Sequence, residues 1–429
     1  NGFISRPLTL LHRTKDSKLA GFFSATRKTL VGAKGRKDFG GVIEQIVTGG
    51  PALGHKIDNF SLKHGDLVLF RKRAQALHTA NFFHAPHRLR LPGYPAPIFP
   101  WVALCFSRYV GHTVTQAEFS KLWSRNVPGT LADGWTPDRA FEALRTATGS
   151  AQQINMRKLR AALAQSRPPI ELCYPDFGGF GPVFSTIHAS KGREADRVIL
   201  MLPRRVDKAL ERMNGSDDGV LEEARVYYVG ATRVRREFAH GIASTLVDSR
   251  KLRADNDREV GIPFDRNRSA KFQFGRSGDI AEARLITART PWCGDDELAA
   301  KRQAGLVDLW KQCLETGREI QVTGKRCGVQ VGTDWHYAYE FRVADQLVGF
   351  SGDHLVYDLM SLAKAVEAKT GGKHKAPKTI PYLQLLGLRT VAVSDSALAG
   401  ELCDPYAESG FFLAPMITGF ANVKTLSYS

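Results

Sequence analysis

Two stretches of the chain carry the clearest patterns of apolar and polar positions. In residues 184–203 an apolar segment is followed by a polar turn and then by a continuous apolar run, Val198 to Leu202, which Pro203 ends. This order predicts a strand, a turn and a second, buried strand. The other stretch predicts a helix with one buried face, because apolar residues recur at helical spacing between charged ones, at Leu221, Ala224, Tyr228 and Ala231. Polar turns at strand ends are where α/β sheets bind ligands, so this region is a candidate for function.

A third pattern joins an apolar strand to a cationic turn and a helix. Residues 67–70 are apolar, Arg71, Lys72 and Arg73 follow, and a helical pattern begins at once. Guanidinium groups bind phosphate oxygens well, so this turn predicts contact with an anion. A solvated cationic turn is the alternative interpretation.

The segments around these patterns predict further elements. Residues 1–64 predict a strand at 8–11, a helical stretch that reaches Leu30, and a second strand at 42–47. Residues after 86 form a proline-rich, extended passage. Three helical patterns follow it, at residues 116–124, 137–146 and 155–165.

The C-terminal residues alternate mostly in strand fashion. Residues 319–350 predict several strands, and helices are expected at 295–315 and 354–368. The first of these helices has an apolar stripe that we expect to be buried, formed by Leu298, Leu306, Leu309 and Trp310. The basic segment 369–378 predicts a flexible link. We therefore expect a separate β-rich module at 291–429.

Composition narrows the class of partner. Lys and Arg number 60 against 43 Asp and Glu, which gives a net charge of +17. Such an excess favours an anionic partner, and nucleic acid is the commonest one. A basic protein without such a partner is the alternative.

The cysteines and the apolar runs indicate where the protein works. Its 6 cysteines are scattered and form no C-x-x-C pair, so neither a zinc site nor a disulfide framework is expected, and a reducing cytoplasm fits. No apolar run is long enough for a membrane span, and no secretory leader is visible at Asn1, so we expect no membrane partner. The start at Asn1 suggests either a fragment or a chain with trimmed ends. His84 and His87 are close in sequence, but Pro86 between them favours a loop over a metal site.

The first two stretches together resemble the fifth and sixth motifs of superfamily 1 helicases of the UvrD/Rep/PcrA type. The fifth motif is matched by Thr186, His188, Lys191, Gly192 and Glu194. The sixth is matched by Glu222, Glu223, Tyr228, Val229, Thr232 and Arg233. Arg193 and Ala195 depart from the usual residues of the family. The cationic turn resembles a further family strand, with Arg71 at the position of its arginine and Arg73 in place of its asparagine.

This resemblance implies an α/β fold with a RecA-like parallel sheet domain and a helical insertion, and the alternating pattern adds the separate C-terminal β-rich module. The RecA-like domain, the second of the helicase motor, is expected to comprise residues 65–85 and 181–290, with 1–64 at its N-terminal edge. The insertion is expected at 86–180, and the β-rich module is the one at 291–429.

The resemblance also implies roles in binding ATP and Mg²⁺. Arg233 is expected to be catalytic, as an arginine finger that neutralises charge on the transferring phosphate. Glu194 is expected to meet the ribose or to couple nucleotide to DNA, and Gly192 to let the backbone turn tightly beside it. Arg13 matches a further phosphate-contacting arginine less well, and an ordinary surface arginine is its alternative interpretation.

Contacts to single-stranded DNA, or to DNA junctions, are implied for a second set of residues. Their donors suit phosphates and sugars without reading sequence. The set comprises Arg71, Arg73, Thr186, His188, Ser190 and Lys191.

One half of the motor is missing from the sequence. A phosphate-cradling loop of the form G-x-x-x-x-G-K-[ST] is absent, since the pairs Gly324-Lys325 and Gly372-Lys373 do not continue with Ser or Thr. We therefore expect the C-terminal motor half of an ATP-dependent DNA helicase or translocase, inactive alone, that needs a first RecA-like domain in cis or in trans. A non-catalytic nucleic-acid-binding or regulatory module built on a RecA-like domain is the alternative.

Overall fold

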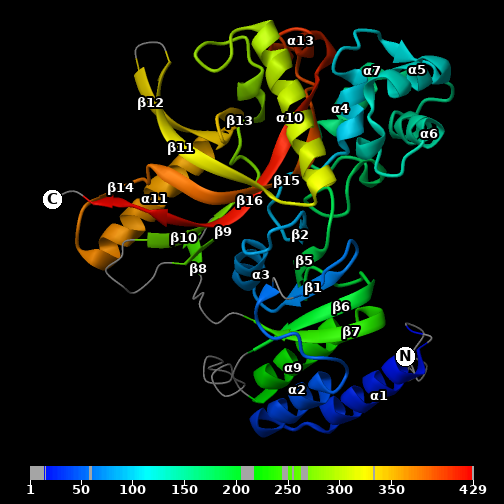
Figure 1. The fold of residues 1–429 in the computed structure, drawn as a ribbon, viewed down its shortest axis with the longest axis vertical. Coiled ribbons are helices and arrows are strands. Elements are labelled where there is room, and N and C mark those ends of the chain that lie inside the picture. The colour runs from blue at the N-terminus through cyan, green and yellow to red at the C-terminus, as the bar shows by residue number, and fades with distance from the viewer. Residues whose placement is uncertain are drawn as a thin grey trace, which may run out of the picture. The chain divides into compact units, whose positions relative to one another are not determined.

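The fold is taken from a computed structural model of residues 1–429 (Figure 1). The structure describes residues 14, 16–57, 60–203, 217–243, 250–253, 256–261, 269–331 and 334–427. The described chain forms two compact units. Unit 1 comprises Asn1–Phe83, Leu89–Pro92 and Gly181–Val247, and unit 2 comprises His84–Arg88, Gly93–Phe180 and Asp248–Ser429.

Within the described residues, unit 1 is built on a five-stranded sheet in the order β2-β5-β1-β6-β7. These strands are β1 (Leu67–Phe70), β2 (Arg88–Arg90), β5 (Val183–Thr186), β6 (Ala195–Leu202) and β7 (Val234–Ile242). β1 pairs in parallel with β5 and with β6, and β6 pairs in parallel with β7. The predicted order of strand, polar turn and buried strand is confirmed by β5 and β6.

Helices cover the sheet of unit 1. They are α1 (Ser17–Gly32), α2 (Phe39–Val47), α3 (Arg73–Ala80) and α9 (Asp217–Ala231), with a short 3₁₀ turn η1 (Arg36–Asp38). Figure 1 shows α1, α2 and α9 together on one side of this sheet. Their apolar side chains share one core with Leu67 and Leu69 of β1. Phe70, which alternates with Leu69, stacks instead on Phe184 of β5, with ring centroids 6.4 Å apart.

Two predictions for unit 1 need correction. The expected strand at 42–47 is the helix α2, because Phe39, Val42, Ile43 and Ile46 recur at helical spacing and are all buried. The predicted helix α9 is confirmed, but its buried face is offset from the expected one. Its buried residues include Val220, Ala224, Tyr227 and Ala231. The predicted strand at 8–11 lies outside the described residues.

Unit 2 contains, in its described part, an eight-stranded sheet in the order β13-β12-β11-β15-β16-β10-β9-β8. The pairs of this sheet are antiparallel. Its strands are β8 (Arg250–Arg253), β9 (Asn256–Gly261), β10 (Ser269–Phe274), β11 (Ile320–Val331), β12 (Asp334–Val343), β13 (Gln346–Phe350), β15 (Thr379–Ala392) and β16 (Phe411–Lys424). Short pairs are formed by β3 (Thr113–Val114) with β4 (Ile154–Asn155), and by β14 (His374–Lys375) with β17 (Leu426–Ser427).

Helices of unit 2 come from both of its long segments. They are α4 (Pro100–Phe106), α5 (Gln116–Asn126), α6 (Pro137–Ala147), α7 (Met156–Leu163), α10 (Asp296–Thr316), α11 (Asp353–Thr370), α12 (Ser396–Ala399) and α13 (Tyr406–Ser409), with 3₁₀ turns η3 (Gly129–Leu131), η4 (Ile170–Leu172) and η5 (Glu282–Leu285). The predicted helices at 116–124, 137–146, 155–165, 295–315 and 354–368 are thereby confirmed. In α10, Trp310 is buried as expected, but Leu298 is 37% exposed, so the buried stripe begins at Ala299 instead.

The boundaries expected from the sequence differ from those of the compact units. Residues 269–274 form β10, which pairs with β16, and this pairing places residues 248–290 in unit 2. The segment expected as a separate helical insertion also belongs there. Thr390 of β15 accepts a hydrogen bond from the Ala103 backbone N–H (3.0 Å) and donates one to the Phe99 carbonyl (2.7 Å), which fixes α4 on the antiparallel sheet.

The basic segment 369–378 is more ordered than a flexible link. Lys375 pairs with Leu426, and the Arg326 guanidinium donates to the Ala376 carbonyl at 3.0 Å. Across the described ranges, no helix combines the length and the apolar character that crossing a bilayer requires.

Candidate functional site

The polar residues singled out in the sequence lie at two edges of the unit 1 sheet. β1 and β5 end at Phe70 and Thr186, which are register partners, and we call this end of the sheet the carboxyl edge. β6 and β7 begin at Ala195 and Val234, which are also register partners, and we call this end the amino edge. Residues 187–194 connect the two edges, so this one short turn contributes residues to both of them.

Hydrogen bonds within the turn fix its path. Its first residue, Ile187, donates its backbone N–H to the Phe70 carbonyl at 2.9 Å, which places the turn beside the end of β1. The Thr186 hydroxyl accepts from the Ala189 N–H at 3.2 Å. Gly192 has a φ of +82°, a left-handed conformation that glycine adopts at little cost. The tight turn expected at Gly192 is therefore present.

The side chains of the turn divide into exposed and buried ones. His188 and Lys191 are exposed and Thr186 is half-buried. Ser190 is fully buried, and its hydroxyl donates to the Ile187 carbonyl at 2.8 Å. This bond stabilises the turn. Because the Ser190 hydroxyl is buried, it is not accessible to DNA at the surface, and we remove Ser190 from the expected DNA contacts.

The amino edge brings Glu194 and Arg233 together. Each residue directly precedes one of two neighbouring parallel strands, and the Ala195 N–H donates to the Arg233 carbonyl at 3.0 Å. Glu194 is exposed. Arg233 is only 6% exposed, and its Nε donates to the Val229 carbonyl in the last turn of α9 at 2.9 Å. The proposed finger arginine is thus folded against the end of its helix.

More charges surround the amino edge than the sequence motifs suggested. Asp196 lies 2.8 Å from the Arg235 guanidinium and 3.6 Å from that of Arg236. Asp196 lies on β6 and the two arginines lie on β7, so these ion pairs join neighbouring strands, and the sequence did not predict them. The edge therefore carries both cations and carboxylates in solvent-accessible positions.

The carboxyl edge contains an ion pair that the sequence did not reveal. Arg71, directly after β1, holds both Glu223 carboxylate oxygens with its Nε, at 2.6 and 2.7 Å. Glu223 comes from α9, so this contact joins the end of a strand to the helix that leads to Arg233. Arg73 is the first residue of α3 and is half-buried.

Three further residues considered in the sequence, Arg13, His84 and His87, add no ligand site to the described structure. Arg13 lies outside the described residues. His84 Nδ1 lies 2.7 Å from a Glu319 carboxylate oxygen, and His87 is fully buried. Among the residues with described positions, no three His, Cys, Asp or Glu side chains gather closely enough to hold a metal ion.

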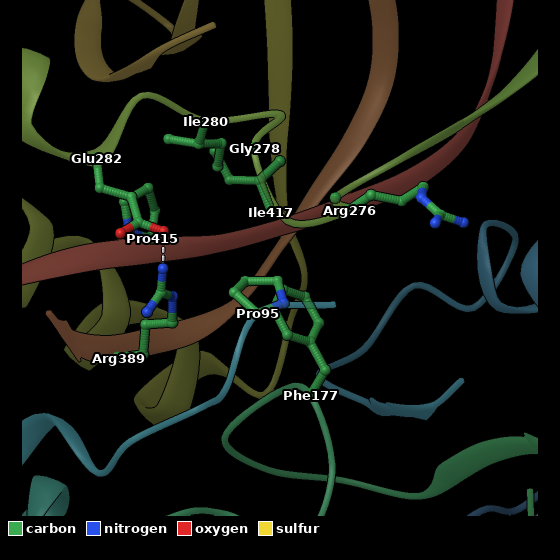
Figure 2. A pocket seen from close by; sticks show the side chains of 10 residues that line it. Pro95, Phe177, Arg276, Gly278, Ile280, Glu282, Arg389, Pro415 and Ile417 are labelled. Carbon is green, nitrogen blue, oxygen red and sulfur yellow. Dashed lines mark ion pairs between the residues drawn. The ribbon is translucent and has the colours of Figure 1, made fainter. Parts of the chain in front are cut away.

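Unit 2 has a hollow of about 260 Å³, part of it open to solvent (Figure 2). Its lining combines apolar side chains, that of Phe177 among them, with the charged side chains of Arg276, Glu282 and Arg389. Arg389 lines it and forms an ion pair with Glu282, and burial lowers the Arg389 pKa to about 10. Figure 2 shows Arg276 extending away from that pair. Since Glu282 already neutralises Arg389, the hollow is a poorer anion site than the edges of unit 1.

Comparison with known proteins adds no further assignment. No protein-family model matches this chain, and no curated protein matches it either.

Proposed function

We propose that unit 1 is the second RecA-like domain of an ATP-dependent DNA helicase or translocase of the superfamily 1 type. The observation that carries this proposal is the placement of Glu194 and Arg233 directly before two neighbouring parallel strands. A nucleotide bound at such an edge meets a carboxylate and a guanidinium from adjacent positions. This is the arrangement that the two resembled motifs require.

The amino edge fits the chemistry of a bound nucleotide. ATP with Mg²⁺, held mainly by a first RecA-like domain, supplies the phosphoryl group that water attacks. Glu194 is an exposed acceptor for ribose hydroxyls. Arg233 neutralises charge as it develops, an effect worth roughly a thousand-fold or more in rate. To do so its guanidinium must turn outward from the Val229 carbonyl, to which its Nε now donates.

The carboxyl edge fits the backbone of a single strand. Arg71, Arg73, Thr186, His188 and Lys191 lie on the end of β1, the start of α3 and the turn after β5. These groups donate hydrogen bonds to phosphate and sugar and do not distinguish bases. The net charge of +17 favours the same partner at longer range.

The test uses the complete motor, with this chain and a first RecA-like domain. Arg233→Ala is expected to abolish DNA-stimulated ATP hydrolysis while the affinity for single-stranded DNA stays within about twofold. Arg236→Ala is the matched control, because Arg236 lies close by on β7 and is 80% exposed. Normal turnover by Arg233→Ala would refute the assignment.

A non-catalytic nucleic-acid-binding module is the second candidate. One observation favours it: the Arg233 side chain lies against its own helix. This candidate predicts that single-stranded DNA binds equally well with and without nucleotide. It also predicts that no partner domain confers ATP hydrolysis.

A further inference from the structure

The ion pair between Arg71 and Glu223 has a geometry that bears on nucleic-acid binding. The Glu223 side chain is 10% exposed and that of Arg71 is 34% exposed, so the carboxylate is the buried partner. Both carboxylate oxygens lie on Nε, at 2.6 and 2.7 Å. Among the described residues, Arg71 contacts Glu223 through Nε, and about a third of the Arg71 side chain stays accessible to solvent.

Glu223 is held in place by its helix. α9 buries Ala224 and Tyr227 in the core of unit 1, and Glu223 directly precedes Ala224 on this packed helix. The long arginine side chain has more freedom than a carboxylate on a packed helix. An anion that binds Arg71 therefore meets a fixed negative charge beside the guanidinium.

We propose that Glu223 masks Arg71, and that a phosphate of single-stranded nucleic acid competes with the Glu223 carboxylate for the Arg71 guanidinium. This inference rests on the proposed function, because it takes the carboxyl edge as the strand-binding surface. Carboxylate and phosphate present similar oxygen pairs to a guanidinium, so one can take the place of the other. Glu223 then lowers affinity for the strand, and binding of the strand loosens the link between β1 and α9.

The consequence reaches the amino edge through α9. Arg233 follows the end of this helix, and its Nε donates to the Val229 carbonyl in the last turn of α9. A strand phosphate that draws Arg71 away from Glu223 removes one restraint from the helix that also holds the proposed finger. Glu223 is thus a positioning residue between the two edges and touches neither substrate.

The experiment measures the affinity of the full chain for a fluorescent single-stranded oligonucleotide at several salt concentrations. Glu223→Gln keeps an oxygen that accepts from Nε and removes the charge. We expect binding about threefold to tenfold tighter, the effect of removing a nearby unit charge close to a surface. The slope of log K against log salt should steepen by up to about 0.7, since one more phosphate contact releases its counterion.

Two matched variants make the result specific. Glu222→Gln removes the same charge from the neighbouring, 67% exposed position, which pairs with Arg225, and should change affinity by less than about twofold. In an Arg71→Ala background, Glu223→Gln should have no effect. Unchanged or weaker binding by Glu223→Gln, or equal tightening in both backgrounds, overturns the masking role.

A measurement on the unmodified protein covers the case in which Glu223→Gln fails to fold. The ¹⁵Nε–¹H signal of Arg71 should shift when single-stranded oligonucleotide saturates the protein, because Nε exchanges its carboxylate partner. A signal that stays in place at saturation contradicts the inference while leaving the proposed function intact. Failure of the chain to bind single-stranded DNA at all overturns the proposed function and this inference with it.

Discussion

Arg258 and Asp279 form an ion pair that is almost wholly withdrawn from solvent, with side chains 3% and 0% exposed. Arg258 Nη2 lies 2.5 Å from Asp279 Oδ1, and its Nε lies 2.7 Å from Asp358 Oδ2. These contacts tie β9, the loop after β10 and α11 together. A buried pair of this kind is strongly destabilising to break, because the remaining charges keep their cost of burial.

Replacement of this arginine should therefore affect unit 2 severely. Arg258→Met removes the positive charge and leaves the carboxylates of Asp279 and Asp358 buried. We expect the free energy of unfolding to fall by about 3–5 kcal/mol, measured by urea denaturation. Arg289→Ala is the control, since Arg289 and Glu401 pair at the surface with 67% and 38% exposure and should contribute at most about 1 kcal/mol. Equal losses in the two variants would contradict the prediction.

Gly192 should resist replacement even though space is available for a side chain. A Cβ there meets no atom within 4 Å, but the φ of +82° is unfavourable for any other residue. Gly192→Ala should cost about 1–2 kcal/mol and weaken single-strand binding, because the turn must rearrange. Gly21→Ala, in the exposed middle of α1 with equal space, should instead stabilise by about 0.5–1 kcal/mol. Melting temperatures of the two variants should move in opposite directions.

His87 should make stability depend on pH. Burial lowers its pKa from 6.5 to about 4, although a hydrogen bond to the Ala85 carbonyl and the charge of Glu319 act in the other direction. Between pH 4 and 6.5 the unfolded chain binds a proton here and the folded chain does not. Stability is thus lost as the pH falls through this window, by about 2–4 kcal/mol.

The matching variant is His87→Gln, which has no group that titrates in this range. Urea denaturation at several pH values should show a flatter dependence between pH 4 and 6.5 than in the unmodified protein. His188→Gln, at an exposed position of unit 1, is the control and should keep the original dependence. The prediction is wrong if His87→Gln loses stability over this window as steeply as the unmodified protein does.

Arg71 should contribute one contact to binding of single-stranded DNA. Arg71→Ala is expected to lower affinity about threefold to tenfold and to reduce the salt slope by at most about 0.7. Arg225→Ala, an arginine of α9 that is 57% exposed and paired with Glu222, serves as the control for the loss of one positive charge. Equal slopes for Arg71→Ala and the unmodified protein would remove Arg71 from the interface.

Local patterns in the sequence predicted much of the fold. β1 with α3, β5 with its turn and β6, and the unit 2 helices α5, α6, α7, α10 and α11 follow from runs and periods within a few residues of one another. The same reasoning was wrong for α2, where a short apolar run fits a strand and a buried helix equally well until its partners are known. In so short a segment, neither the composition nor the spacing of apolar residues distinguishes a strand from a buried helix.

Relationships between distant residues were not predictable from one sequence. The pair Arg71–Glu223 joins positions 152 residues apart, and no local pattern connects them. The placement of residues 248–290 in unit 2 depends on the pairing of β10 with β16, which is equally non-local. For the candidate site, the resemblance identified Glu194 and Arg233, and the structure added the partners of Arg233, Arg71 and Ser190. Their roles with nucleotide and DNA stay predictions.

The discontinuity of both units has a consequence for how the protein is made. During synthesis, all five strands of the described unit 1 sheet have been translated once the ribosome passes Ile242. The strands that α4 packs against, β15 and β16, are translated only with residues 379–424. Trp101 and Phe106 of α4 are fully buried in the complete fold, and they cannot become buried until the last part of the chain has been translated. Since domains generally fold as units in the order of synthesis, a nascent chain halted near residue 247 presents a formed sheet beside an uncovered aromatic segment. Such an intermediate is prone to aggregate, and its uncovered aromatic segment is a surface that a chaperone can bind.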